Sequence, residues 1–202
     1  MVMKTSYIFQ LLISVCVIVN TKNTSNDMRF IRTNNADTRF VELCSMLDEY
    51  LIKIIGEEKQ QKEYNKHNVL ADIDNVILLV NGEKSIGCAG LKRVDNTTAE
   101  VKRVFITDEF RHHGFGRKMI SEIEHLAKNK GYKILLLETG KSLKGAQALY
   151  ASCGFSLIEN YGPYAGLESS VCMKKNIGNY LETERLILRP IKNSDANDIF
   201  EY

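Results

Sequence analysis

The sequence predicts an α/β fold built on a mixed sheet, and three observations lead to this prediction. Two apolar runs surround "NGEK" at 81–84, which is a strong signal for a β-hairpin. After this antiparallel part, the pattern changes to strand, helix, strand and helix, from 99 to 154. The second strand of that unit, "YKILLLETG" (132–140), contains a continuous apolar run, as expected for a strand buried on both faces. Antiparallel strands that lead into a strand-helix-strand unit give a mixed sheet.

The first elements are a strand and a long amphipathic helix. "MRFIRT" (28–33) alternates apolar and polar residues, as a strand does. The polar residues of "NNAD" suit the cap of a following helix, and residues 38–55 have helical periodicity. The apolar stripe of this helix is predicted to face the core and comprises Phe40, Leu43, Met46, Leu47, Leu51 and Ile54.

The remaining elements complete the sheet around a strand-helix-strand-helix unit. A third strand, 99–107, is expected after the turn at "DNTT", and the last two strands flank the loop "GPYAGLE". The other expected ranges are 117–131 and 143–154 for helices, and 132–140, 155–161 and 169–177 for strands. A sheet of this kind has a ligand crevice at the carboxyl end of its parallel strands.

The composition indicates a globular domain without a nucleic-acid or metal site. Of the 202 residues, 44% are hydrophobic, which is enough to bury a core. The 27 basic and 25 acidic residues leave a net charge of +2, so no global basic field would attract a nucleic acid. The cysteines occur singly and without histidines at ligand spacing, which argues against zinc and against a disulfide framework. They are Cys16, Cys44, Cys88, Cys153 and Cys172.

Residues 1–27 form a separate N-terminal segment. One lysine precedes an apolar run, 7–19, that is shorter than the roughly 20 residues of a membrane-spanning helix, so we expect no membrane span. The pattern fits a signal peptide but lacks an A-x-A-like cleavage site. An uncleaved extension, or translation that begins at Met28, is the alternative. Because the cysteines are expected to be reduced, we expect a cytoplasmic protein.

A glycine-rich turn, "RHHGFGRKM" (111–119), lies between a predicted strand and a predicted helix. Such a turn lets several backbone N–H groups converge at the positive end of the helix dipole, which suits a phosphate or a pyrophosphate. Gly114 and Gly116 allow the backbone to approach the anion closely. The basic side chains that add charge around it are Arg111, His112, His113, Arg117 and Lys118.

Two other phosphate-binding motifs match this turn less well. The Walker pattern is absent, because Gly116 is followed by neither lysine nor the required serine or threonine. A dinucleotide-binding fingerprint would use Gly114 and Gly116, with Glu138 near the position of the ribose-binding acid. However, Met119 occupies the position of the third glycine. A dinucleotide-binding protein therefore remains the less favoured alternative.

The R-x-x-G-x-G pattern of residues 111–116 resembles the pyrophosphate-binding motif of the GNAT superfamily of N-acetyltransferases. Downstream, "AQALYASCGF" (146–155) resembles the A-x-x-L-Y-x-x-x-G-F element of that family, and "YGPYAGLESSVCMKK" resembles the final-strand region of small bacterial-type members. The resemblance covers residues 28–178. It implies the GNAT acyl-CoA N-acyltransferase fold, in which a mostly antiparallel sheet has a parallel strand-helix-strand unit splayed around the cofactor.

Residues 179–202 form a third segment. "LETERLILRPIKNSDANDIFEY" resembles the first strand and helix of a second GNAT domain, of the type that acetylates ribosomal-protein N-termini. A segment of this length cannot form its own core. It is therefore expected to be a fragment of a second domain, with a docking tail as the alternative.

The resemblance implies transfer of an acetyl group from acetyl-CoA to a primary amine by direct attack, without a metal. The acceptor is expected on a small molecule, an amino acid or a peptide, near the loop 161–168. The resemblance implies no nucleic-acid partner, and it is compatible with a homodimer. A non-catalytic acyl-CoA-binding sensor with the same fold is the alternative function.

The resemblance also assigns site residues. Tyr150 stands where the family has the tyrosine that protonates the leaving thiolate, and a phenol of pKa ~10 suits that role. Glu100 lies at the spacing before Arg111 at which histone-type members have their general base, with Glu138 or a water molecule as alternatives. The residues expected to bind acetyl-CoA are Val104, Phe105 and Ile106 along the pantetheine arm, and Arg111, His112, His113, Gly114, Phe115, Gly116 and Arg117 around the pyrophosphate. Leu143 replaces an asparagine of many members, so one side-chain hydrogen bond to the cofactor is not expected.

Overall fold

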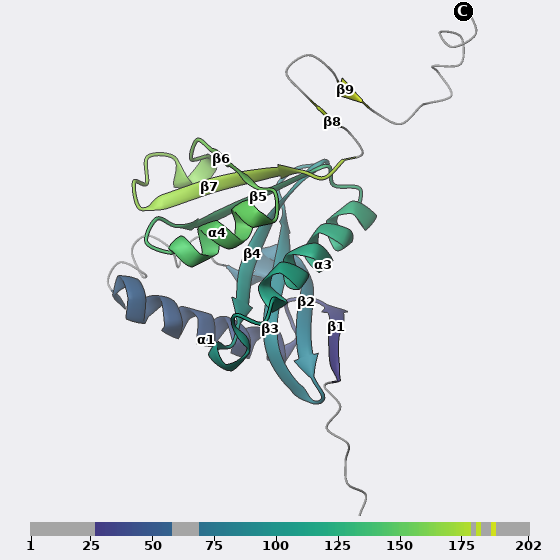
Figure 1. Ribbon diagram of the computed structural model, residues 1–202, viewed down its shortest axis with the longest axis vertical. Coiled ribbons are helices and arrows are strands. Elements are labelled where there is room, and N and C mark those ends of the chain that lie inside the picture. The colour runs from purple at the N-terminus through teal and green to yellow at the C-terminus, as the bar shows by residue number, and fades with distance from the viewer. Residues whose placement is uncertain (1–26, 58–68, 179–180, 183–186, 189–202) are drawn as a thin grey trace, which may run out of the picture.

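The computed structural model describes residues 27–57, 69–178, 181–182 and 187–188. One mixed sheet runs through it in the order β1-β2-β3-β4-β5-β7-β6, and all neighbours in this sheet are antiparallel except β4 and β5, which are parallel (Figure 1). The strands are β1 Met28–Thr33, β2 Ile73–Asn81, β3 Lys84–Arg93, β4 Thr98–Ile106, β5 Ile134–Gly140, β6 Ser156–Ile158 and β7 Ser170–Asn176. The mixed α/β sheet predicted from the sequence is confirmed.

Helices cover both faces of the sheet. Helix α1 (Thr38–Ile55) lies on one face, whereas α3 (Phe115–Asn129) and α4 (Lys144–Ser152) lie on the other (Figure 1). Helix α1 begins where the sequence predicts, because the Asp37 carboxylate accepts a hydrogen bond from the backbone N–H of Arg39 at 3.0 Å. No helix in the described ranges combines the length and apolarity needed to cross a membrane.

Two apolar layers form the core, one on each face of the sheet. The layer under α1 contains Phe40, Leu43, Cys44 and Leu47 of that helix, together with residues of β2, β3 and β4. The predicted stripe is wrong at two positions, because Met46 and Ile54 are 44% and 43% exposed. Both residues lie beside the narrow stripe of α1 that touches the sheet, and Cys44 is buried instead.

Strand β4 contains a bulge that shapes the rest of the molecule. Gly90 of β3 pairs with Lys102, but Cys88 pairs with Phe105, so β4 has one extra residue at this point. Arg103 lies in the bulge and has a φ of +56°. The extra residue reverses the alternation of side chains, so that Lys102 before the bulge and Phe105 after it both face α1.

The parallel pairing of β4 with β5 ends shortly before this bulge. It extends from Thr98 and Ile134 to Val101 and Leu137, and beyond this point the two strands separate. The splayed parallel unit that the resemblance implies is therefore present in the fold. Its opening lies at the carboxyl end of the two strands, where a mixed sheet of this kind places its ligand crevice.

Several element boundaries differ from the prediction. Helix α3 begins at Phe115 rather than at residue 117, because Gly114 adopts the left-handed conformation, with φ of +80°, and forms the N-cap. The strand expected over 155–161 is limited to β6, because the chain leaves the sheet after Ile158. Short strands β8 (Leu181–Glu182) and β9 (Ile187–Leu188) pair antiparallel. The segment 1–26 and the rest of the tail 179–202 lie outside the described residues.

Candidate active site

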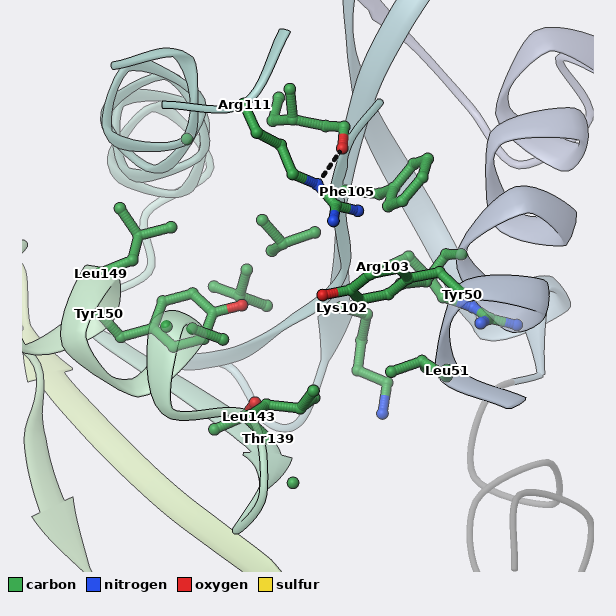
Figure 2. Close-up of a pocket in the computed structure, with 18 of the residues that line it drawn as sticks. Tyr50, Leu51, Lys102, Arg103, Phe105, Arg111, Thr139, Leu143, Leu149 and Tyr150 are labelled. Carbon is green, nitrogen blue, oxygen red and sulfur yellow. Dashed lines mark hydrogen bonds between the residues drawn. The ribbon is translucent and has the colours of Figure 1, made fainter. Parts of the chain in front are cut away.

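A cavity of about 580 Å³ occupies the opening between β4 and β5 (Figure 2). Its walls come from the second half of α1, from β4 after Glu100, from the glycine-rich turn and the start of α3, from the end of β5 and from α4. Among the residues expected to bind acetyl-CoA, those that line it are Val104, Phe105, Ile106, Arg111, His112, Gly114, Gly116 and Arg117. His113 and Phe115 lie outside this lining.

The N-terminus of α3 forms one end of the cavity. Gly114, the N-cap residue, provides no side chain to accept hydrogen bonds from the first helical N–H groups, and no side chain caps them. These N–H groups and the helix dipole make this end attractive to an anion. Gly116 is close to α4, because a Cβ added there would lie 3.0 Å from Cδ2 of Leu149. The two glycines therefore have different functions: one shapes the turn and the other allows two helices to approach.

Arg111 connects the glycine-rich turn to β4 and α1. Its Nε donates a hydrogen bond to the carbonyl oxygen of Ile106 at 2.9 Å, and its guanidinium lies 4.1 Å from the centroid of the Tyr50 ring (Figure 2). It also forms an ion pair with Asp108 at 2.9 Å. These contacts fix the side chain at the rim of the cavity. His113, by contrast, is exposed, with its Nδ1 2.7 Å from the carbonyl oxygen of Arg111.

Tyr150 on α4 lies on the opposite wall. Its ring is almost completely buried, makes an edge contact with Phe155 and points into the cavity (Figure 2). Burial, and then the nearby carboxylate of Glu138, raise the pKa of this phenol far above its usual range. Tyr150 therefore keeps its proton at neutral pH and is available as a hydrogen-bond donor or acid.

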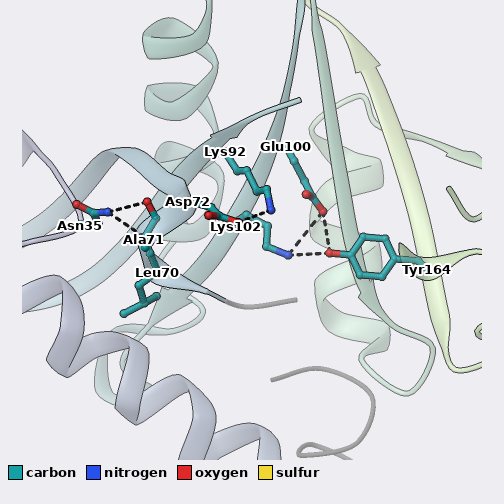
Figure 3. Close-up of polar contacts among 8 residues, drawn as sticks. All are labelled: Asn35, Leu70, Ala71, Asp72, Lys92, Glu100, Lys102 and Tyr164. Atoms are coloured by element: carbon teal, nitrogen blue, oxygen red, sulfur yellow. Dashed lines mark hydrogen bonds and ion pairs between the residues drawn. The ribbon is translucent and has the colours of Figure 1, made fainter. Parts of the chain in front are cut away.

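The two candidate bases differ in their access to the cavity. Glu138 lines it, and Oε1 of this carboxylate has no hydrogen-bond partner among the described residues. Burial raises the pKa of Glu138. Glu100 is buried behind the wall and does not line the cavity. Its Oε1 accepts a hydrogen bond from the hydroxyl of Tyr164 at 2.9 Å (Figure 3). The same oxygen accepts a second one from the hydroxyl of Tyr161 at 3.2 Å.

Sequence reasoning missed several residues at this site. Lys102 lines the cavity and is 7% exposed, yet a lysine within a charged strand gives no signal of burial. Tyr50 and Leu51 of α1 also line it, although their helix lies far away in the sequence. The acceptor was expected near the loop 161–168, but Tyr161 and Tyr164 of that loop do not line the cavity. They instead hold Glu100, which no local pattern indicates.

No cluster of three or more histidine, cysteine or acidic side chains in the described ranges is arranged to hold a metal ion. The cavity thus combines an anion-attracting helix end, a protonated tyrosine and a carboxylate. This combination suits the transfer of a group from a phosphate-bearing donor.

The comparisons with known proteins agree with this chemistry. The family model for the acetyltransferase (GNAT) family matches residues 40–155. The chain is 30% identical to the IAA acetyltransferase of Azospirillum brasilense over 136 residues, which are 67% of this chain and 88% of that protein. It is 33% identical to human N-acetyltransferase 8 over 78 residues, which are 36% of this chain and 34% of that protein.

Solved structures share the fold. A GNAT-family acetyltransferase from Staphylococcus aureus is similar with a TM-score of 0.58 and 20% identity, over 74% of this chain and 99% of that one. A GNAT-family acetyltransferase from Elizabethkingia anophelis, solved with acetyl-CoA bound, is similar with a TM-score of 0.54 and 21% identity, over 75% and 99% of the two chains. With the family model matching more than half of its length, the chain belongs to the GNAT family of acetyltransferases, which are acyltransferase enzymes.

Proposed function

We propose that this acetyltransferase takes its acetyl group from acetyl-CoA and transfers it to a primary amine of a small molecule, an amino acid or a peptide. The observation that carries the proposal is the single cavity that joins the N-terminus of α3 to Tyr150 and Glu138. Its volume of about 580 Å³ lies in the usual range for small-molecule sites. The similarity to a GNAT structure with acetyl-CoA bound supports the choice of donor.

In this proposal, the pyrophosphate of acetyl-CoA lies at the start of α3. The first N–H groups of the helix need acceptors, and phosphate oxygens provide them. His112 and Arg117 line the same end of the cavity and add positive charge, whereas Arg111 supports the turn from β4 and α1. The residues present therefore fit a pyrophosphate without requiring a lysine of the Walker type.

The pantetheine arm is proposed to follow β4 into the cavity. Beyond Val101, β4 is not paired with β5 in the described residues, so we expect the backbone of Val104, Phe105 and Ile106 to face an extended ligand, with the Ile106 carbonyl shared with Arg111. This path leads from the helix end towards Tyr150. The separation of two neighbouring strands thus provides both the space and the hydrogen-bonding edge.

Tyr150 and Glu138 are proposed to handle the protons of the reaction. Acetyl-CoA supplies a thioester, whose sulfur leaves as a thiolate and requires a proton. The phenol of Tyr150 is protonated and faces the cavity, so it is the proposed donor of that proton. Glu138 is the proposed acceptor of the amine proton, because it lines the cavity and Glu100 does not. Glu100 therefore has a different proposed role, which the next section describes.

Isothermal titration calorimetry of the full chain with acetyl-CoA tests the donor. We expect binding by the wild-type protein and binding at least tenfold weaker for Arg117→Ala. Lys118→Ala is the matched control, because it removes the same charge one residue further along α3 but does not line the cavity. No binding of acetyl-CoA, or displacement of it by NAD at equal concentration, would contradict the proposal.

An amine panel tests the transfer itself. Release of free coenzyme A thiol is followed with acetyl-CoA and a set of small amines, amino acids and peptides. Thiol release that depends on one class of amine, together with acetylated product by mass spectrometry, supports the enzyme and identifies the acceptor. Binding of acetyl-CoA without transfer to any amine would favour the acyl-CoA-binding sensor.

A further inference from the structure

Lys102 and Glu138 lie beside one another at the point where β4 and β5 begin to separate. The parallel ladder ends with Val101 paired to Leu137, so Lys102 and Glu138 are the first residues after the last paired position on each strand. Val101 and Leu137 face the core under α3. By alternation, Lys102 and Glu138 share the opposite face, and both line the cavity.

The ammonium of Lys102 is held from the side opposite the cavity. Its Nζ donates a hydrogen bond to the hydroxyl of Tyr164 at 2.8 Å and lies 3.6 Å from Oε1 of Glu100 (Figure 3). The Tyr164 hydroxyl in turn donates to the same Glu100 oxygen at 2.9 Å. Burial lowers the pKa of Lys102, whereas the negative charges of Glu100 and Glu138 raise it, so this triangle opposes the loss of the proton that burial favours.

Figure 2 shows that the side chain of Lys102 extends away from Arg111, so the positive charge lies at the end of the cavity that is not proposed to bind pyrophosphate. Glu138, by contrast, has an oxygen without a partner among the described residues. A carboxylate buried in this way takes up a proton unless a cation stands close to it. Lys102 lines the same cavity, and its positive charge acts on this carboxyl to lower its pKa.

We propose that Lys102 is a positioning residue: its ammonium, fixed by Glu100 and Tyr164, keeps Glu138 ionised at the cavity wall, so that Glu138 accepts the proton of the acceptor amine. In that step an N–H bond of the amine breaks, an O–H bond forms on Glu138, and the electron pair stays on nitrogen. Glu100 then acts through Lys102 rather than as the base. The inference rests on the proposed function, because it assigns a role to that same site.

The other groups that face Glu138 do not replace this cation. Burial raises the pKa of the Tyr150 and Tyr164 phenols and of the Cys172 thiol, so all three are uncharged at neutral pH. The remaining neighbours are the Ser170 hydroxyl and Glu100. Burial raises the pKa of Glu138, the Ser170 hydroxyl and then the positive charge of Lys102 lower it, and the negative charge of Glu100 raises it. Lys102 is thus the one cation among these groups.

Nuclear magnetic resonance of the full chain, labelled with ¹³C at the glutamate side-chain carboxyls, tests the inference without an acceptor. The Glu138 resonance is assigned by its loss in Glu138→Gln, and its titration midpoint is compared between variants. For Lys102→Met we expect the midpoint to rise by about one pH unit or more. For Lys102→Arg, which keeps the charge, we expect it to remain close to the wild-type value.

Two further variants separate the role of the charge from a general effect on the fold. Lys92→Met deletes a lysine whose ion pair with Asp72 at 2.7 Å lies outside the cavity, so the Glu138 midpoint should not move (Figure 3). Tyr164→Phe keeps every charge but removes one of the two contacts that fix Lys102, so we expect a smaller rise in the Glu138 midpoint. If Lys102→Met does not fold, the Glu138 midpoint in Tyr164→Phe tests the inference in its place. An unchanged midpoint in both Lys102→Met and Tyr164→Phe, or an equal rise in Lys92→Met, overturns the inference.

The proposed function and this inference fail in different ways. If the wild-type chain does not bind acetyl-CoA in calorimetry, the proposed function fails, whatever the titration of Glu138 shows. If it binds acetyl-CoA and Glu138 does not respond to Lys102→Met, only the positioning role fails.

Discussion

Arg103, in the bulge of β4, forms an ion pair with Asp48 of α1 at 2.5 Å, and its second terminal nitrogen lies 3.2 Å from the other carboxylate oxygen. A non-glycine residue with a φ of +56° costs about 1–3 kcal/mol and persists only when its surroundings hold it. The two hydrogen bonds to Asp48 offset this cost. They also connect α1 to β4, and both elements line the cavity. The pair therefore holds the bulge and the position of α1 together.

This relationship predicts the effect of Asp48→Asn. Breaking a fully buried pair costs about 3–5 kcal/mol, but the Asp48 side chain is 33% exposed, so we expect the free energy of unfolding to fall by about 2 kcal/mol. Asp27→Asn is the control, because Asp27 forms an exposed pair with Arg29 and should contribute less than about 0.5 kcal/mol. Urea denaturation measures both. Equal losses in the two variants would contradict the role given to Arg103.

The conformation of Gly114 gives a second prediction. Its φ is +80°, and a Cβ added there would meet no atom within 4 Å, so the cost of Gly114→Ala is conformational rather than steric. We expect a loss of about 1 kcal/mol in the free energy of unfolding. Gly145 lies inside α4 and also has open space around it, but its φ is ordinary. Gly145→Ala should therefore stabilise the protein by about 0.5–1 kcal/mol. A stabilising Gly114→Ala would show that the turn does not need the left-handed conformation.

Features with local signals were predicted well. The helix 38–55 was predicted with its observed bounds, because Asp37 caps its start and the stripe of apolar residues marks its face. The hairpin at "NGEK" was predicted because two residues, Gly82 and Glu83, suffice to reverse the chain between β2 and β3. The glycine-rich turn was found for the same reason, since its glycines are adjacent to the helix that they begin.

Features that depend on distant residues were not predicted. The contact of Lys102 with Tyr164 joins residues that lie 62 positions apart, and no pattern near either residue reveals it. The bulge at Arg103 interrupts a strand that appears regular in the sequence. The bulge and the splay of β4 from β5 place Glu138, and not Glu100, in the cavity lining, and the spacing of Glu100 before Arg111 carries no information on either feature.

Glu138 gives a third prediction, on the dependence of stability on pH. Burial raises its pKa above the ordinary value of 4.5, so the folded chain holds this proton more tightly than the unfolded chain. This contribution stabilises the fold below pH 4.5 and is lost as pH rises through the folded pKa. Glu138→Gln removes the cost of burying a charge, so we expect it to be more stable than the wild-type protein at pH 7 but not at pH 4. Urea denaturation at both pH values measures this difference. A variant that is destabilised equally at the two pH values would contradict it.

Tyr150 gives the last prediction, on catalysis. Tyr150→Phe removes only the hydroxyl, so the ring keeps its contact with Phe155 and the fold should be retained. Loss of a general acid slows a reaction by about 10²–10⁴-fold, so we expect kcat to fall by at least about 10²-fold. Affinity for acetyl-CoA, measured by calorimetry, should change little. Thiol release with an amine that the wild-type protein acetylates measures the rate.

Tyr132→Phe is the control for this experiment, since Tyr132 packs against the same core layer but does not line the cavity. It should retain the wild-type rate. Because the pKa of Tyr150 is raised, the rate of the wild-type protein should also not decline near pH 10, where an ordinary tyrosine ionises. Wild-type turnover in Tyr150→Phe would mean that the leaving thiolate takes its proton from elsewhere, and Tyr150 would then serve only to close the wall between α4 and the cavity.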